Sequence, residues 1–288
     1  MEKGVLYVVA TPIGNLEDLS PRALRILSAV DFIIAEDTRH SRPLLRHFGI
    51  ATPMTAMHEH NERQVMEHIL QRLQGGESAA LISDAGTPLI SDPGFPLVRE
   101  CHRHGIRVCP IPGPSAAICA LSAGGMPTDR FLFEGFLPRT QSARRERLRR
   151  LKGERHTLVF YESSHRLPES LRDMAAELGA ERPALMAREL TKLHETLISG
   201  TLGKLLEQVE ADPMQRKGEM VLLVGGAGDD AGSGQAAETK RILEILLQEL
   251  PLKQAAALAA RITGEKKNRL YRQALALRDG TDSAKPDT

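Results

Sequence analysis

Aromatic residues are scarce in this sequence: they make up 3% of its 288 residues, and tryptophan is absent. Any hydrophobic core must therefore consist mainly of aliphatic side chains, and a hydrophobic content of 41% is sufficient to build one. At this length we expect one very large domain or two to three smaller ones.

Cysteines and long apolar runs are scarce too. The three cysteines, Cys101, Cys109 and Cys119, form no Cys-x-x-Cys pair and no disulfide framework, which is typical of a reducing compartment. No apolar run approaches the roughly 18 residues of a membrane-spanning helix, and the first apolar run is too short for a signal peptide. The sequence therefore predicts a cytoplasmic protein without a membrane span.

Several familiar catalytic signatures are missing. The sequence has no Walker A motif, no Gly-x-Ser-x-Gly, no His-Glu-x-x-His and no Gly-x-Gly-x-x-Gly after an apolar strand-like run. His58 and His60 flank Glu59 but lack a third ligand at a suitable spacing, so we interpret them as solvated loop histidines. No metal site is predicted.

Short apolar segments alternate with Gly/Pro loops and helical segments along the first 120 residues. This alternation is typical of a mostly parallel α/β domain, which we expect over residues 1–113. The predicted strands are 6–10, 31–37, 79–82 and 106–111, and the predicted helices include 21–30, 62–74 and 96–104. Residues 52–61 are predicted to be a loop.

A second α/β domain is predicted over residues 114–226. Its expected strands are 131–138, 156–166, 183–191, a strand and turn at 195–202, and a closing strand at 219–226. Its expected helices include 139–155, 168–178 and 202–209. The fold class predicted for the chain is therefore α/β with two α/β domains, followed by a small helical extension.

The extension begins after a stretch rich in Gly, Ser and Asp, residues 227–238, which we predict to be a flexible linker. An apolar stripe then predicts a helix over 239–250. Two further helices, 253–261 and 266–277, would meet at a short turn containing Gly264 and resemble a helix-turn-helix, with a plain helical hairpin as the alternative. We expect an RNA-binding extension over 239–279 and a disordered tail over 280–288.

The formal net charge is only +1, but the basic residues are unevenly distributed. Residues 139–155 contain eight Lys or Arg against two Glu, and residues 253–278 contain seven against one. Two basic segments in a near-neutral chain predict local contacts with a polyanion.

Loops of small residues follow several predicted strands. The longest, Ser83–Pro96 with the sequence SDAGTPLISDPGFP, comes directly after the apolar run AALI. In open α/β sheets, ligands bind at the carboxyl ends of the strands. Small side chains let a ligand contact the backbone, which suits a neutral or zwitterionic ligand with adenine and hydroxyl groups better than a triphosphate. An ordinary loop between a strand and a helix is the alternative interpretation.

These loops resemble those of the tetrapyrrole methylase superfamily of S-adenosylmethionine-dependent methyltransferases. More narrowly, the chain resembles the ribosomal RNA small subunit methyltransferase I family over about residues 4–225. The segments that carry the resemblance are VATPIGNLEDLSPRA, AEDTR, SDAGTPLISDPG, PGPSA, FYESSHR and KGEMVLLV.

The resemblance implies two α/β domains with a cofactor cleft between them and S-adenosyl-L-methionine as the cofactor. It implies 2′-O-methylation of a cytidine ribose in the decoding region of 16S rRNA, the small ribosomal subunit as a partner, and a homodimer. The implied cofactor-binding residues are Pro12, Asp84, Ala85, Gly86, Thr87, Ile90, Ser115, Ala116, Glu162 and Leu190. Thr87 stands where tetrapyrrole enzymes usually have an acid, so we expect a hydroxyl or backbone contact there.

Methyl transfer from a sulfonium is an in-line displacement, and a ribose hydroxyl is a poor nucleophile until a base draws on its proton. We predict that Glu36, Asp37 and Arg39 form a catalytic cluster near the acceptor. Glu189 is another candidate base, and Lys192 or Arg39 could stabilise developing negative charge. A structural ion pair or an RNA contact is the alternative for each of them.

Two other functions remain compatible with the sequence. One is a methyltransferase of the same fold that acts on a tetrapyrrole, which the basic segments, the helical extension and the AEDTR and SDAGTP loops disfavour. The other is a non-catalytic RNA-binding module, which the intact small-residue loops disfavour.

Overall fold

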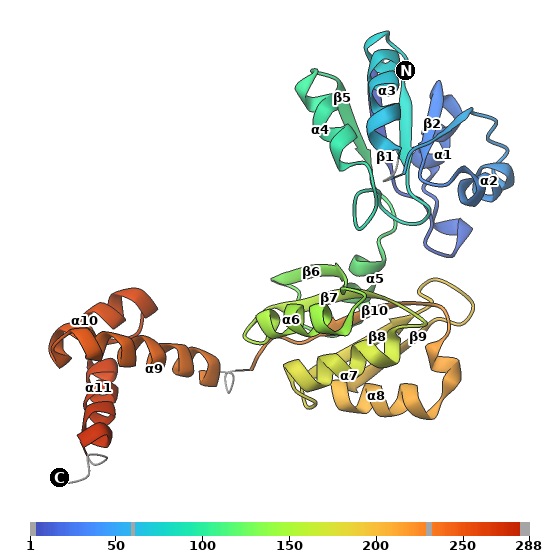
Figure 1. Ribbon diagram of the computed structural model, residues 1–288. Coiled ribbons are helices and arrows are strands. Elements are labelled where there is room, and N and C mark those ends of the chain that lie inside the picture. Colours follow the sequence, from blue (N-terminus) through green and yellow to red (C-terminus); the bar gives the residue numbers. More distant parts are fainter. Residues whose placement is uncertain (1–3, 59–60, 229–231, 283–288) are drawn as a thin grey trace. The chain divides into compact units, whose positions relative to one another are not determined.

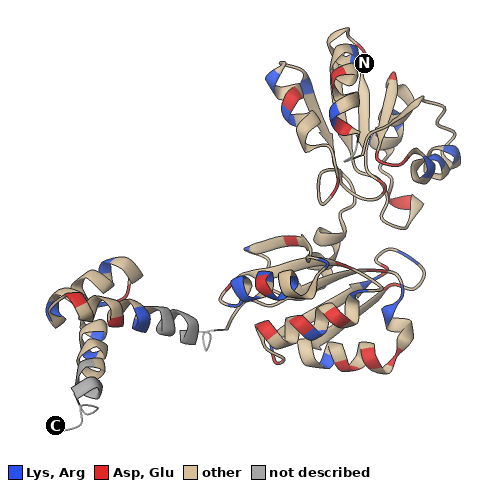
Figure 2. Cartoon of the chain, in the orientation of Figure 1, with Lys and Arg blue, Asp and Glu red and all other residues tan. Residues whose placement is uncertain are grey.

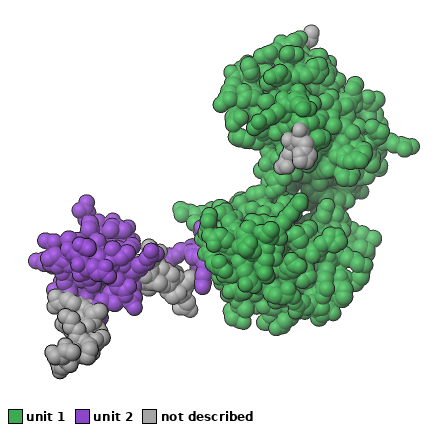
Figure 3. Space-filling model, viewed as in Figure 1, with its two compact units in different colours: residues 1–151, 156–225 green, residues 152–155, 226–288 purple. Residues whose placement is uncertain are grey.

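The computed structural model describes residues 4–58, 61–228 and 232–282, with side chains for all of these except 232–238 and 278–282. The chain divides into two compact units (Figure 3). The first comprises residues 1–151 and 156–225, and the second comprises residues 152–155 and 226–288. Each unit is described by itself below.

The first sheet of the first unit is parallel throughout, as the sequence predicted (Figure 1). Its strand order is β3-β2-β4-β1-β5. The strands are β1 (Val5–Val9), β2 (Phe32–Ala35), β3 (Met54–Ala56), β4 (Ala79–Ile82) and β5 (Arg107–Ile111). The helices are α1 (Pro21–Ala29), α2 (Thr38–His47), α3 (Glu62–Gln74) and α4 (Phe95–Arg103), and a 3-10 turn spans Leu16–Asp18.

Both faces of this sheet are buried, because successive side chains of a strand point to opposite faces. Val5, Tyr7 and Val9 of β1 pack in one cluster with α1, whereas Leu6 packs in the other with α3 and α4. The loop predicted over 52–61 was wrong at β3. That strand has only three half-buried residues at the sheet edge, too few for a recognisable alternation.

The second sheet is mixed and has the order β6-β7-β10-β8-β9. Its strands are β6 (Phe131–Phe136), β7 (Thr157–Ser163), β8 (Pro183–Arg188), β9 (Thr196–Thr201) and β10 (Glu219–Val224), of which only β6 and β7 pair in parallel. Helices α6 (Gln141–Leu151), α7 (Leu167–Leu178) and α8 (Leu202–Ala211) pack on one face, and α5 (Ala116–Ala123) packs on the other. A 3-10 turn spans Pro213–Arg216.

The position of β10 decides which residues meet at one edge of this sheet. It lies antiparallel between β7 and β8, so it begins where they end. Glu219 is therefore opposite Ser163, and Met220 is opposite Arg188. The start of the last strand thus joins the carboxyl ends of two earlier strands.

The described residues of the second unit form three helices: α9 (Gly232–Glu249), α10 (Leu252–Thr263) and α11 (Lys267–Asp282). Leu243, Ala256, Ala259, Leu270 and Ala274 form their shared core. Small alanines at the contact let the helix axes approach closely. Gly264 ends α10 in a left-handed conformation (φ 73°), which glycine adopts at little cost.

Two predicted boundaries in this unit were wrong. The linker predicted over 227–238 is shorter, because α9 already begins at Gly232; residues 229–231 lie outside the described residues. A formed helix propagates more easily than it nucleates, so α9 and α11 continue into Gly-containing ends. Helix α11 therefore enters the tail predicted to be disordered, of which 283–288 lie outside the described residues. None of the helices described in either unit is long and apolar enough to cross a lipid bilayer.

Candidate active site

A cavity of about 550 Å³ in the first unit is lined by residues from both sheets. Ligand pockets in proteins commonly have volumes of about 300–1,000 Å³. The lining residues come from the carboxyl ends of strands, from the start of β10 and from the start of α5. The sequence-predicted residues among them are Glu36, Asp84, Ala85, Gly86, Thr87, Ile90, Ser115, Ala116, Glu162 and Leu190.

The loop after β4 is fixed to the end of β1 by two backbone hydrogen bonds. Thr11 N donates to Gly86 O over 2.9 Å, and Gly86 N donates to Thr11 O over 3.0 Å. Gly86 has a φ of 79°, and a Cβ there would lie 3.2 Å from the side chain of Ile13. Glycine at this position therefore permits both the turn and the close packing of the two loops.

The same loop is also tied to the loop that precedes α5. The hydroxyl of Thr87 donates to Pro114 O over 2.9 Å, so this hydroxyl has a structural partner. Leu89 and Ser91 have left-handed backbone conformations, with φ values of 73° and 71°. Such strain costs roughly 1–3 kcal/mol per residue and is concentrated at ligand-binding sites. The loop is thus held in one shape before any ligand binds.

Tyr161 of β7 connects the second sheet to the start of α5. Its hydroxyl oxygen accepts a hydrogen bond from Ala117 N over 3.3 Å, and its ring packs edge-on against Phe133 with centroids 5.0 Å apart. Burial raises the pKa of Tyr161 above its ordinary value, so the phenol stays protonated at neutral pH. Its role in the cavity wall was not predicted from the sequence.

Glu36, Asp84 and Asp92 are three of the five acidic residues that line the cavity. Burial, with the negative charges of Glu36 and Asp84, raises the pKa of Asp92 to about 6. Asp84 accepts a hydrogen bond from Asp37 N over 3.2 Å and lies 2.9 Å from Nδ1 of His40, whose pKa it raises. The resulting negative potential favours a cationic ligand.

Asp37 and Arg39 are not among the residues that line this cavity. Asp37 caps α2 by accepting a hydrogen bond from Arg39 N over 2.8 Å, and its carboxylate lies 2.7 Å from the Arg39 guanidinium. Hydrogen bonds from Arg39 hold the pKa of Asp37 well below its usual range. A carboxylate stabilised in this way is a poor proton acceptor, and of the predicted cluster only Glu36 is among the residues that line the cavity.

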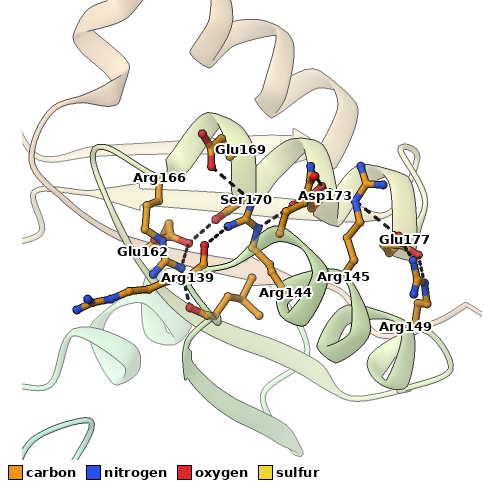
Figure 4. Close-up of polar contacts among 12 residues, drawn as sticks. Arg139, Arg144, Arg145, Arg149, Glu162, Arg166, Glu169, Ser170, Asp173 and Glu177 are labelled. Atoms are coloured by element: carbon orange, nitrogen blue, oxygen red, sulfur yellow. Dashed lines mark hydrogen bonds and ion pairs between the residues drawn. The ribbon is translucent and has the colours of Figure 1, made fainter.

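Glu162 also lines the cavity, but its carboxylate already has partners (Figure 4). The side chain is fully buried and accepts hydrogen bonds from Ser170 Oγ over 2.5 Å, Arg166 over 3.2 Å and Ser163 N over 2.8 Å. A ligand would therefore meet the backbone of Glu162 rather than its charge. Of the predicted cofactor-binding residues, Pro12 does not line the cavity, but its neighbour Ile13 does.

Lys192 forms ion pairs with two glutamates beside the cavity. Its Nζ lies 2.8 Å from Glu189 and 3.0 Å from Glu219, which lines the cavity. Burial opposes ionisation of Glu189, but the hydrogen bond from Lys192 outweighs it and lowers the pKa of Glu189. Lys192 also lies so close to Gly14 that a Cβ at Gly14 would collide with it. Glu189, which does not line the cavity, is therefore better suited to holding this corner than to accepting a proton.

The comparisons with known proteins agree with this architecture. The family model described as Tetrapyrrole (Corrin/Porphyrin) Methylases matches residues 5–206, and the model described as RsmI C-terminal HTH domain matches residues 233–278. Ribosomal RNA small subunit methyltransferase I of Pseudomonas aeruginosa is 58% identical over 276 residues, which cover 96% of this chain and 98% of that protein. The chain belongs to the ribosomal RNA small subunit methyltransferase I family.

Solved structures show that the fold extends beyond this family. A cobalt precorrin-4 methyltransferase matches with a TM-score of 0.58 at 16% identity, over 77% of this chain and 95% of that one. A uroporphyrin-III C-methyltransferase of Thermus thermophilus, in complex with S-adenosyl homocysteine, matches with a TM-score of 0.52 at 19% identity, over 77% and 96%. At these identities the likeness concerns the fold alone.

S-adenosylmethionine, the cofactor of the tetrapyrrole methylases, fits the residues of the cavity. Apolar side chains such as Ile13, Ile90 and Leu190 suit an adenine, and the small residues Ala85 and Gly86 leave backbone groups within reach of polar atoms. The carboxylates at the cavity wall complement a positively charged sulfonium. The chemistry of the lining residues therefore agrees with the membership of the chain in a methyltransferase family.

More than half of the lining residues were missed by the sequence-based prediction: Ile13, Ser91, Asp92, Phe136, Tyr161, Ser163, Ser164, Ala187, Gly218, Glu219, Met220 and Val221. Four of them belong to Gly218–Val221, at the start of β10. The segment KGEMVLLV carries part of the family resemblance and was predicted to be a closing strand, but no site residue was assigned to it. The start of β10 lies at the cavity because β10 is inserted between β7 and β8. It could not be predicted, because no local sequence pattern encodes the order of strands in a sheet.

Proposed function

We propose that this chain transfers the methyl group of S-adenosylmethionine to the ribose 2′-hydroxyl of a cytidine in the decoding region of 16S rRNA. The single observation that carries the proposal is the cavity at the strand ends, in a chain that is 58% identical over 276 residues to a ribosomal RNA small subunit methyltransferase I. We further propose that it acts on the small ribosomal subunit, as a homodimer, in the cytoplasm.

The proposed cofactor site consists of Asp84–Thr87, Ile90, the Ser115–Ala116 turn, the backbone of Glu162, and Leu190, with Pro12 behind its neighbour Ile13. When bound, S-adenosylmethionine supplies an electrophilic methyl group. The loops' fixed backbone orients the ligand, because Thr11, Gly86 and Pro114 already hold them together. Orientation of this kind can supply a large part of the rate of a displacement reaction.

For proton transfer we propose Glu36 as the group that accepts the ribose proton. Glu36 follows β2 and lines the cavity, directly before the helix that Asp37 caps. In this proposal Asp37 positions α2 and Arg39 faces the RNA, so the three residues have different roles. The neighbouring Asp92, with its raised pKa, keeps part of its population neutral near pH 6 and limits the repulsion among the carboxylates.

We propose that the second unit contributes to RNA binding. Helices α10 and α11 meet at Gly264, and exposed cationic side chains follow on α11, among them Lys267 and Arg272. Tyr271 is 41% exposed between them, where an unpaired base could stack on its ring. Removing residues 239–288 should therefore weaken RNA binding but leave S-adenosylmethionine binding intact.

The test is methyl transfer by the purified full-length chain to small ribosomal subunits, with the modified nucleotide mapped by mass spectrometry of nuclease fragments. One 2′-O-methylcytidine in the decoding region is the expected result. Methylation of a base, of another RNA, or of a porphyrin precursor offered in parallel would overturn the proposal. Sedimentation of the same preparation tests the homodimer.

A further inference from the structure

Helix α2 carries a face of positive charge. Arg39, Arg42, Arg46 and His47, which we call the α2 cationic face, line an open hollow of about 510 Å³ together with Pro43. The helical repeat places residues three, four and seven positions apart on one side. The helix contains no Asp or Glu, and Figure 2 shows its basic residues without acidic ones among them.

Two arginines of this face have no counter-charge in the described part of the chain. The side chains of Arg42 and Arg46 are exposed and form no hydrogen bond or ion pair with any described residue, whereas Arg39 is paired with Asp37. A guanidinium is a planar donor that matches a phosphate with two parallel hydrogen bonds. Exposed, unpaired arginines on a helix are therefore suited to phosphate groups.

The basic segment 139–155, in contrast, is largely neutralised inside the protein. On α6, Arg144 and Arg145 each lie 2.7 Å from Asp173, and Arg149 lies 3.1 Å from Glu177 (Figure 4). Arg147 pairs with Glu134 over 2.7 Å, and Arg150 pairs with Glu146 over 3.1 Å. These arginines of α6 thus have carboxylate partners on α7, on β6 and within α6, which leaves less unpaired positive charge for the polyanion contact predicted for this segment.

The α2 cationic face is also anchored to the edge of the cavity. Asp84 lines the cavity and holds both Asp37 N and His40 at the start of α2. Glu36, the last residue before that start, lines the cavity as well. From Thr38 to Arg46 the helix rises by about 12 Å, which is the length of a few nucleotides.

We propose that the α2 cationic face holds the phosphodiester backbone of the substrate RNA beside the nucleotide that enters the cavity. This inference rests on the proposed function for the identity of the RNA, but the charge and geometry of the face stand independently of it. Phosphate contacts position a nucleic acid without reading its sequence, and they make affinity dependent on salt. The face is therefore expected to contribute affinity and register rather than choice of base.

The experiment compares two full-length double variants that lose the same charge. Arg42→Gln/Arg46→Gln removes two unpaired arginines of α2, and Arg149→Gln/Arg150→Gln removes two exposed but internally paired arginines of α6. The affinity of each for a mixed-sequence single-stranded RNA oligonucleotide and for small ribosomal subunits is measured over a range of salt concentrations.

The α2 variant is expected to flatten the plot of log affinity against log salt by about 1.4, because each single-strand phosphate contact contributes about 0.7. The α6 variant should keep the wild-type slope, and Arg42→Lys/Arg46→Lys should restore most of the loss. Calorimetry with S-adenosylmethionine should give the wild-type affinity for all variants, which shows that the fold and cavity are intact.

Equal slopes for the α2 and α6 variants would overturn the inference, whether or not the wild-type chain methylates RNA. A flattened slope for the α2 variant alone would support it, even if the wild-type chain failed to methylate the small subunit. If the slope flattened but the small subunit was not methylated, the proposed function would be wrong and the RNA contact of the α2 cationic face would still be supported.

Discussion

Helices α2 and α6 are both rich in arginine, but most arginines of α6 are paired with carboxylates of the protein, whereas two arginines of α2 are not. On α6 the guanidinium groups meet carboxylates of α7 and β6, and Arg144 is buried with Asp173. On α2, Arg39 pairs with Asp37 and His40 pairs with Asp84, whereas Arg42 and Arg46 are exposed and have no acidic partner among the described residues. Charge in a sequence therefore indicates how much positive potential exists, whereas the fold decides how much of it is available to a partner.

The same contrast holds for two carboxylates. Burial alone would raise the pKa of Asp173, but hydrogen bonds from Arg145 and Arg144 outweigh it, so the pKa is lowered. Asp92 lies half-buried beside Glu36 and Asp84, and its pKa rises to about 6. One carboxylate helps to hold the fold together, and the other belongs to a cavity that can hold a cation.

The largest effect on stability is expected from breaking the buried pair of α6. Arg144→Met should lower the free energy of unfolding of the first unit by about 3 kcal/mol, because it leaves Asp173 buried with fewer donors. Urea unfolding measures this change. A loss below about 1 kcal/mol would mean that Arg145 and Gln141 alone satisfy Asp173.

The largest effect on turnover is expected beside α2. Glu36→Gln should reduce kcat about 100-fold, within the range for loss of a general base, and leave the affinity for S-adenosylmethionine within a few-fold of the wild type. The matched control is Glu134→Gln, which removes a carboxylate paired with Arg147 of α6 and should not reduce turnover. Equal turnover for both variants would exclude Glu36 as the base and move the search to Asp92.

These two predictions show where sequence reasoning succeeds and where it stops. Alternating apolar segments and Gly/Pro loops predicted the parallel sheet and the loop Asp84–Ile90, because those signals are local. The antiparallel insertion of β10 and the pairing of Arg144 with Asp173, 29 residues away, depend on tertiary packing. Asp92 resembled an ordinary turn residue in the sequence, and only its burial beside Glu36 and Asp84 reveals it.

The two carboxylates should give opposite pH dependences of stability. Asp92 has a raised pKa in the folded state, so its contribution to stability is present below pH 3.8 and is lost as the pH rises through about 6. Asp92→Asn should therefore stabilise the first unit by about 1–2 kcal/mol at pH 8, after allowance for solvent screening, and have little effect at pH 4.

Asp173 has a lowered pKa, so its contribution is present above its ordinary pKa and is lost as the pH falls. Asp173→Asn should destabilise the unit at pH 8 and progressively less in acid. Unfolding free energies measured from about pH 2 to pH 8 test both signs, because the contribution of Asp173 changes only below its ordinary pKa of 3.8. Parallel pH profiles for the two variants would contradict the distinction between a carboxylate paired with arginines and one that lies near other carboxylates.

The smallest expected effect is a change in the free energy of unfolding that has opposite signs for arginine substitutions in α2 and in α6. Arg42 lies three residues after Arg39 and four before Arg46, so Arg42→Gln should relieve like-charge repulsion and stabilise the first unit by about 0.2–0.5 kcal/mol. Arg150→Gln should destabilise it by a similar amount, because it removes the ion pair with Glu146. Both changes should shrink in about 1 M salt, which screens exposed charges. Like-charge repulsion on an RNA-binding surface would thus slightly destabilise the free protein. If Arg42→Gln instead lowered the free energy of unfolding, Arg42 would have a partner within the protein, and the case for the α2 cationic face would be weaker.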